Sequence, residues 1–309
     1  MLSSNKLAEF SIGICASDTA SNLQKLLELI QEEEFSDEFL LRRIVIVASG
    51  CPFATIAPLY DLARRDQRVV LIEELERRGK AEALNRIIEC APCEYLLFIN
   101  SDALPVKGAM NAILKSLNAD DSAGVVSGSP FFDRRGGWTS RLQQLMWMVH
   151  NECSERLNHM AIGNHGSDEL IAVRTRLLER MPVVLVNDGA YIAGRAKLRG
   201  YLIKYCSSAR VEIDVPTSIV DTISQRRRII FGHFQIWSLV GKSPKTVESM
   251  VILSPRLGAA MVVKTLAQHP DLILTLPIAL VEESIAFTLA VFDRMTSTNR
   301  HGVWRRYGS

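Results

Sequence analysis

The chain has 309 residues, of which 48% are hydrophobic and 23% are charged, and its formal net charge is +2. This length and composition suit one large α/β domain, or one domain with a C-terminal extension. The near balance of 36 basic and 34 acidic residues gives no overall signal for nucleic-acid binding.

The cysteines and the first residues indicate in which cellular compartment the protein is expected. The start, MLSSNKLAEF, lacks the long apolar core of a secretory signal. Six scattered cysteines then suggest free thiols in a reducing compartment, so we expect a cytoplasmic location. Cys90 and Cys93 form a CxxC pair without the second Cys/His pair that a zinc knuckle needs, and we interpret it as structural.

The first 135 residues alternate between buried-strand runs and helical patterns. The predicted strands are 10–16, 44–48, 69–72, 95–99 and 124–127. Helices are expected after Ser17 or Asp18, after Pro52, from Gly79 to about Ile88, and near Lys107. This alternation predicts βαβ units and a largely parallel, Rossmann-like α/β sheet with flanking helices.

The pattern changes after about residue 136. The expected elements are a long amphipathic helix 138–160, an irregular strand 167–173, a short basic helix 174–180, a helix after Asp188 followed by a strand, a strand 211–215 and a helix 218–240. We therefore expect a nucleotide-binding part at about 1–135, an acceptor part at about 136–240 and a helical C-terminal region at 241–309.

The segment 272–292 has nearly the length of a membrane span. Its twelve strongly apolar residues each favour insertion by at most about 0.6 kcal/mol, whereas one central charge costs about 3 kcal/mol. Glu282 and Glu283 lie at the centre, and Pro277 interrupts the first half. The sum is near zero, so we predict an interfacial hairpin or a protein-buried helix; the same segment could also pair subunits.

Polar residues follow several predicted strands, and in an open α/β sheet such residues converge on one site. Gly79 and Lys80 begin a helix and could bind a phosphate; the alternative is an ordinary capped helix. Asp102 suits Mg²⁺ or Mn²⁺ bridging a diphosphate, or it caps the next helix. Asp188 is a second acid or a helix cap. The motifs GxGxxG, GxxxxGK[ST], HExxH and GxSxG are absent from the sequence.

Several segments in order resemble the family 2 inverting nucleotide-sugar glycosyltransferases of GT-A fold, which include polysaccharide synthases. SIGICASDTASNL and IVIVASGCPFATI are similar to the first two strands and their nucleotide loops, and RRGKAEALN is similar to GKxxALN. INSDALP resembles the DxD motif, with Asn100 replacing its first Asp. The resemblance runs from Phe10 to about His233.

The second half extends the resemblance. GSDELIAVRTRLLERMP is similar to the acceptor-side segment, and VNDGAYIAGRAKLRGYLIKY is similar to the segment that supplies the catalytic base. Asp188 matches that base, and Asn187 replaces the acid before it. QRRRIIFGH resembles QxxRW, with Ile229 in place of the Trp of processive synthases. This replacement favours a single-addition enzyme near the membrane over a processive one.

The resemblance implies an inverting transfer from a nucleoside-diphosphate sugar to a glycan or lipid-linked acceptor, with Asp188 as general base. It implies Mg²⁺ or Mn²⁺ on Asp102, with His233 as a second candidate ligand. The implied nucleotide-sugar-binding residues are Ala16, Asp18, Ser49, Glu73, Gly79, Lys80, Asn85, Asn100, Ser101, Asp102, Gln225 and Arg228. The alternatives are a non-catalytic nucleotide-sugar-binding or membrane scaffold protein, and a sugar-phosphate nucleotidyltransferase.

Overall fold

A computed structural model describes residues 7–17, 22–133, 137–296 and 301. Within these residues one eight-stranded sheet has the order β3-β2-β1-β4-β7-β6-β8-β5. The strands are β1 (Ala8–Ser17), β2 (Phe39–Ser49), β3 (Val69–Glu74), β4 (Tyr95–Asn100), β5 (Leu104–Pro105), β6 (Ala123–Phe131), β7 (Leu170–Arg174) and β8 (Leu202–Glu212). The helices are α1 (Leu23–Glu32), α2 (Phe53–Arg65), α3 (Lys80–Cys90), α4 (Ala109–Asn118), α5 (Gly137–His159), α6 (Asp188–Leu198), α7 (Ile219–Val240), α8 (Val247–Leu253), α9 (Pro255–Gln268) and α10 (Leu276–Met295).

The sheet is parallel in its first half and mixed in its second. β1 is parallel to β2 and β4, and β2 is parallel to β3, which confirms the predicted βαβ winding. β6 is parallel to β8, but β7 runs antiparallel to both β4 and β6, and β5 runs antiparallel to β8. The reversal of β7 matters because it places the beginning of that strand beside the end of β4.

Both faces of the sheet are covered by helices, as the continuous apolar strands predict. One face packs against α1, α2 and α4, and the other packs against α3 and α6. Gly13 in β1 permits the closest approach, because a Cβ there would lie 2.5 Å from the Ile87 side chain of α3. Each fully buried Leu or Ile contributes about 1.5–3 kcal/mol to this core.

Two predicted elements in the second half differ from the structure. The basic helix expected at 174–180 is only a 3₁₀ turn, Thr175–Leu177, because Leu177 and the following Met181 turn into the core and Pro182 comes next. The strands expected at about 201–205 and 211–215 form one long strand, β8, which pairs with β6 on one side and β5 on the other.

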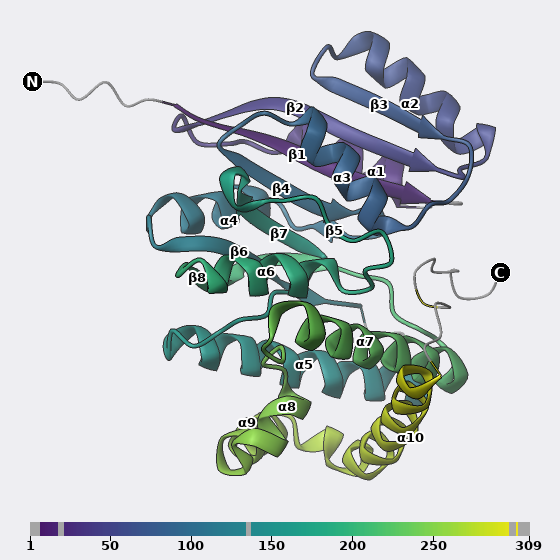
Figure 1. Cartoon of the computed structure of the whole chain (residues 1–309), viewed down its shortest axis with the longest axis vertical. Helices are drawn as coiled ribbons and strands as arrows, with labels where there is room; N and C mark the ends of the chain where they lie inside the picture. The colour runs from purple at the N-terminus through teal and green to yellow at the C-terminus, as the bar shows by residue number, and fades with distance from the viewer. Residues whose placement is uncertain (1–6, 18–21, 134–136, 297–300, 302–309) are drawn as a thin grey trace, which may run out of the picture.

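The helices α5 and α7 to α10 gather at one end of the molecule, beyond β8 in Figure 1. Arg226 on α7 donates hydrogen bonds to both carboxylate oxygens of Glu283 on α10, at 2.8 and 2.9 Å, and to Glu248 on α8. Arg227 forms an ion pair with Asp293 of α10. These two arginines therefore hold α10 against α7 and form neither a solvated helix face nor a diphosphate site.

One helix of the described chain, Pro270–Met295, is long and apolar enough to cross a membrane by length and composition alone. Its mean hydropathy is 1.8, and 22% of the apolar window is buried. Glu282 is buried at its centre, and burial raises the pKa of that carboxyl to about 7. Glu282, Glu283 and Asp293 of this helix thus face protein. Leu280, Val281 and Phe292 are each about 60% exposed.

Candidate active site

Lys80 lies at the edge of the sheet where β1, β2 and β4 end. It is the first residue of α3 and follows Gly79, whose φ of 96° favours glycine. The Lys80 Nζ atom lies 2.6 Å from Oδ2 of Asp168 and 3.1 Å from Oδ2 of Asp188. The ammonium group therefore joins two carboxylates that come from separate parts of the chain.

Asp188 is buried at the first turn of α6. Burial and the repulsion of Asp168 raise the pKa of this carboxyl to about 6, although the attraction of Lys80 lowers it. Gly189 allows the close approach, because a Cβ there would lie 2.8 Å from the Asp168 Cβ atom. A buried carboxylate with a raised pKa and a neighbouring cation is suited to accepting a proton near neutral pH.

The end of β4 brings a second group of polar side chains. The Asn100 amide donates a hydrogen bond of 2.6 Å to the Glu169 carboxyl. Burial, together with the charges of Asp168 and Asp102, raises the pKa of Glu169 to about 8. An Asp at position 100 would place a second carboxylate at the same distance from Glu169, and the two charges would repel each other. The neutral Asn100 amide avoids this repulsion and donates a hydrogen bond instead.

Asp102, Asp168, Glu169 and Asp188 thus lie in one region with Lys80 and Asn100, and we call these six residues the acid cluster. Four of these residues, Asp102, Asp188, Lys80 and Asn100, are predicted from the sequence, whereas Asp168 and Glu169 are not. These two acids precede β7, where Leu170 pairs with Ile99, so an antiparallel strand delivers them to the carboxyl end of β4. Two adjacent acids before a buried run are the signal that could have found them.

Other predicted residues on the nucleotide side lie around the same edge. Ala16 is buried near the end of β1, opposite Ala48. The Ser49 hydroxyl donates to Glu74 at 2.9 Å. Ser101 is half-buried in the turn after β4. Asp18 lies outside the described residues.

Three predicted residues have other contacts. The Asn85 side-chain amide donates a hydrogen bond of 3.0 Å to the Met181 carbonyl and accepts one of 2.8 Å from the Met181 N–H. It therefore fixes α3 to the segment before α6. Glu73 accepts a hydrogen bond of 2.5 Å from the Tyr60 hydroxyl. His233 lies on α7 with its ring 5.6 Å from the His165 ring. Gln225 and Arg228 are half-buried on α7.

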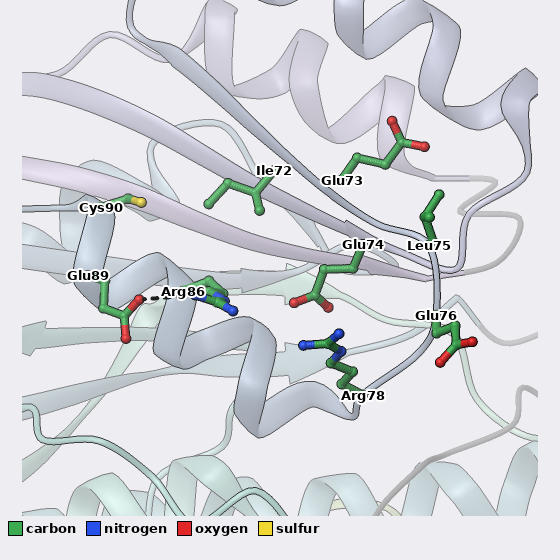
Figure 2. A pocket seen from close by; sticks show the side chains of 9 residues that line it. All are labelled: Ile72, Glu73, Glu74, Leu75, Glu76, Arg78, Arg86, Glu89 and Cys90. Atoms are coloured by element: carbon green, nitrogen blue, oxygen red, sulfur yellow. Dashed lines mark ion pairs between the residues drawn. The ribbon is translucent and has the colours of Figure 1, made fainter.

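A cavity of about 600 Å³ lies between β3 and α3 (Figure 2). Its walls include Glu73, Glu74 and Cys90, and an ion pair of 3.6 Å joins Arg86 to Glu89 beside it. Lys80 and the rest of the acid cluster are not part of its lining. The cavity runs along α3 away from that cluster, so we do not identify it with the active site.

No group of three or more His, Cys, Asp or Glu side chains within 7–17, 22–133, 137–296 and 301 is arranged to hold a metal ion. Magnesium and manganese in nucleotide enzymes are commonly held by one or two carboxylates together with substrate phosphates. Asp102 with Glu169 beside it fits that arrangement, because hard carboxylate oxygens are the ligands these ions prefer. A site completed by the donor's diphosphate is therefore compatible with these residues.

A sequence profile described as glycosyl transferase family 2 matches residues 11–181, which is more than half of the chain. The chain belongs to glycosyl transferase family 2. The predicted family is thereby confirmed. The matched segment contains β1 to β7 and five residues of the acid cluster, all except Asp188.

Two curated relatives of this family 2 glycosyltransferase are poly-β-1,6-N-acetyl-D-glucosamine synthases. The Staphylococcus aureus (strain COL) protein is 23% identical over 203 residues, covering 63% of this chain and 48% of that protein. The Staphylococcus epidermidis protein is 23% identical over 208 residues, covering 64% and 49%. The chain spans about half the length of the curated relatives it matches.

The fold of this family 2 glycosyltransferase is similar to a solved mannosyltransferase from Pyrobaculum calidifontis in complex with GDP-Man and Mn²⁺. The TM-score is 0.65 at 19% identity, and the match covers 94% of this chain and 88% of that one. This likeness confirms the GT-A fold that the sequence predicts.

Proposed function

We propose that the protein transfers a sugar from a nucleoside-diphosphate sugar to an acceptor hydroxyl with inversion at the anomeric carbon. The observation that carries this proposal is the buried Asp188 carboxylate, 3.1 Å from Lys80 in the acid cluster that also contains Asp102. A base and a diphosphate-binding acid at one edge of a GT-A sheet are what a single displacement requires.

In the proposed reaction the Asp188 carboxylate accepts the proton of the acceptor hydroxyl. The hydroxyl oxygen forms a bond to the anomeric carbon while the bond from that carbon to the diphosphate oxygen breaks. The nucleoside diphosphate leaves with the bonding electron pair. Lys80 stabilises the charged form of Asp188 before the transfer, and Asp168 holds Lys80 in place through the 2.6 Å contact.

Asp102 would hold Mg²⁺ or Mn²⁺ together with the donor's diphosphate, with Glu169 beside it. When bound, such an ion neutralises part of the diphosphate charge and makes it a better leaving group. The Pyrobaculum calidifontis enzyme was solved with Mn²⁺ and GDP-Man, and this supports the same class of donor and ion here. The His233 ring packs against the His165 ring, whereas Asp102 lies in the acid cluster. We therefore propose Asp102, and not His233, as the protein ligand of the ion.

Replacing Asp102 with Ala should weaken the Mn²⁺-dependent part of nucleotide binding by about 10- to 100-fold, the order seen when partners of a metal site are removed. The measurement is calorimetric titration of nucleoside diphosphates with and without Mn²⁺. Asp61→Ala, an exposed acid on α2, is the matched control and should leave both affinities unchanged. Equal Mn²⁺ dependence in the Asp102→Ala variant and the wild type would exclude Asp102 as the ligand.

The acceptor is proposed to be a glycan, free or lipid-linked, because the curated relatives are named as synthases of a poly-N-acetylglucosamine. Within the chain we propose the nucleotide part at about 1–135, the acceptor part at about 136–240, and a C-terminal region at 241–309. Ile229, where the family's processive synthases have Trp, supports single addition.

We also propose that the C-terminal region touches the cytoplasmic face of a membrane. Leu280 and Val281 of α10 and Ile252 and Leu253 of α8 are each at least 60% exposed. Exposed apolar side chains on helices whose acids are turned into the protein are typical of interfacial contact. The basic residues at 300, 305 and 306 would suit an anionic leaflet.

The full chain should therefore float with vesicles that contain about one-third anionic lipid. A variant with Leu280→Asn and Val281→Asn should bind several-fold less, because each change removes apolar area from the contact without adding charge. Leu75→Asn, which changes an apolar residue after β3 that is 89% exposed, is the control and should float like the wild type. Unchanged flotation of the double variant would contradict membrane contact. A wild type that binds no vesicles and is a dimer, together with a double variant that is a monomer, would show instead that this surface pairs subunits.

A further inference from the structure

The segment that leads to the proposed base has no regular secondary structure of its own. Within 182–187 the Leu185 N–H donates to the Pro182 carbonyl at 3.0 Å, and Asp188 follows as the first residue of α6. A segment that lies in neither a strand nor a helix takes its position from contacts with neighbouring elements. The contacts of 182–187 therefore determine where the Asp188 carboxylate lies.

Gln235 on α7 binds this segment with both atoms of its side-chain amide. The amide oxygen accepts a hydrogen bond of 3.1 Å from the Val186 N–H, and the amide nitrogen donates one of 3.1 Å to the Val184 carbonyl. These two main-chain groups lie two and four residues before Asp188. The two bonds together fix both the distance and the rotation of the segment relative to α7, which a single bond would not do.

Asn187 makes a second connection to the same helix. At the N-cap of α6 an asparagine side chain usually accepts a hydrogen bond from the first turn, yet here it accepts none from α6, which the structure describes in full. Its amide nitrogen donates instead to the Ile229 carbonyl of α7 at 2.9 Å. Gly232 leaves the space for this contact, because a Cβ atom there would lie 2.5 Å from the Asn187 Cγ atom. The side chain next to the base is thus bound to α7 and not to its own helix.

The replacement of an acid by Asn187 fits this contact. A carboxylate has no N–H, so an Asp at position 187 would face the Ile229 carbonyl as acceptor to acceptor and would add a negative charge beside Asp188. The amide avoids both effects and donates a hydrogen bond. This departure from the family pattern is therefore compatible with an active base, and it does not by itself indicate a non-catalytic protein.

Val186 connects the same segment to the C-terminal helix. Its buried side chain packs in one apolar cluster with Ile230 and Phe231 of α7 and with Ala286 and Ala290 of α10. The ion pairs between α7 and α10 hold these two helices together beside it. The base-bearing segment is thus supported by side chains of both α7 and α10.

Resting on the proposed function, we propose that Gln235 and Asn187 are positioning residues that hold the Asp188 carboxylate where it accepts the acceptor's proton. Neither side chain is proposed to touch the donor, the acceptor or the ion, so each acts only through Asp188. Their loss should lower turnover and leave nucleotide binding unchanged, because the diphosphate is proposed to bind on the Asp102 side. A misplacement of a reacting group by about 1 Å can cost about 10²-fold in rate.

The test is a double-mutant cycle between each positioning residue and the base. Gln235→Met keeps the length of the side chain but loses both bonds to the segment, and Asn187→Ala loses the bond to α7. Each should lower turnover about 10- to 100-fold in the wild-type background. In the Asp188→Asn background the further loss should be less than about twofold, because an amide cannot act as the base in either position. The assay follows release of nucleoside diphosphate from α-linked nucleoside-diphosphate sugars, with Mn²⁺ and a panel of glycans as acceptors.

Asn111→Ala is the matched control for the loss of a side-chain amide contact. The Asn111 side-chain oxygen accepts from the Ser36 N–H at 3.1 Å and from the Ser36 hydroxyl at 3.2 Å. This contact lies before β2, at the opposite edge of the sheet from the base. The variant should melt at a lower temperature than the wild type and keep wild-type turnover per nucleotide-binding site. Calorimetric titration of nucleoside diphosphate with Mn²⁺ counts these sites, so a loss of folded protein is not mistaken for a loss of turnover.

The outcomes separate this inference from the proposed function. Equal losses in the wild-type and Asp188→Asn backgrounds would overturn the inference, because they would show a role that does not act through the base. Wild-type turnover in Gln235→Met and Asn187→Ala, with Asp188→Asn still slow, would overturn it while the transferase proposal stands. If Asp188→Asn turned over at the wild-type rate, or if the wild type turned over no donor, the proposed function and this inference would both be wrong.

Discussion

Replacing Asp188 with Asn should lower turnover by about 10²–10⁴-fold, the usual contribution of a general base. The amide has nearly the same shape and can still lie against Lys80, but it cannot accept the acceptor's proton. Donor binding should stay close to wild type, because the diphosphate is proposed to bind on the Asp102 side. Steady-state kinetics and nucleotide titration of the same preparation measure both quantities.

The matched control is Asp221→Asn, which changes a half-buried first-turn acid on α7 that bonds only to its own cap, Ser218, among the described residues. This variant should keep wild-type turnover. If Asp188→Asn turned over at the wild-type rate, Asp188 would not be the base. If it lost nucleotide binding as well, its role would lie in the donor site.

Replacing Lys80 with Met should lower turnover at pH 7 by about tenfold and move the acid limb of the pH profile upward. In the wild type the Asp188 carboxyl has a pKa raised to about 6, so activity should fall as the pH drops below that value. Without the ammonium group, the buried Asp188 carboxylate would lie beside the partly exposed Asp168 carboxylate with no cation between them. One of them would keep its proton, so the charged base would form only at higher pH.

The Lys80→Met variant should therefore recover activity as the pH rises toward 9, which a simple loss of folding would not reproduce. Lys80→Arg keeps a cation between the two acids, so its acid limb should stay near pH 6 even if turnover falls. An unchanged acid limb in Lys80→Met would mean that Lys80 does not stabilise the charged form of Asp188.

The fold could be predicted largely because its signals are local. Each of the first strands is an apolar run such as Tyr95 to Ile99, and each polar turn that follows marks a sheet edge. Asp102 and Asp188 were found in this way, because one follows a strand directly and the other begins a helix.

The missed features depend on contacts between distant segments. Asp168 and Glu169 reach the site because β7 runs antiparallel, and strand direction has no local signal. His150, His165 and His233 become neighbours only when α5, α7 and the connection after α5 pack together. The ion pairs of Arg226 and Arg227 likewise have no local signal, because their partners on α10 lie more than fifty residues away.

Motif residues can also serve packing. Asn85 belongs to the GKAEALN segment that supports the family resemblance, yet its side chain is bound to the Met181 main chain. A match to a family pattern does not distinguish a residue that touches the substrate from one that positions its helix. Only the contacts in the folded chain make that distinction.

One NMR time course tests the proposed reaction most directly. The wild type and Asp188→Asn are incubated with Mn²⁺ and a panel of α-linked nucleoside-diphosphate sugars, together with a panel of glycans as acceptors. We predict that the wild type releases nucleoside diphosphate and first forms a β-linked sugar, and that Asp188→Asn does so about 10²–10⁴-fold more slowly. Release of pyrophosphate, retention of the α configuration, or no turnover with any donor would contradict an inverting transfer based on Asp188.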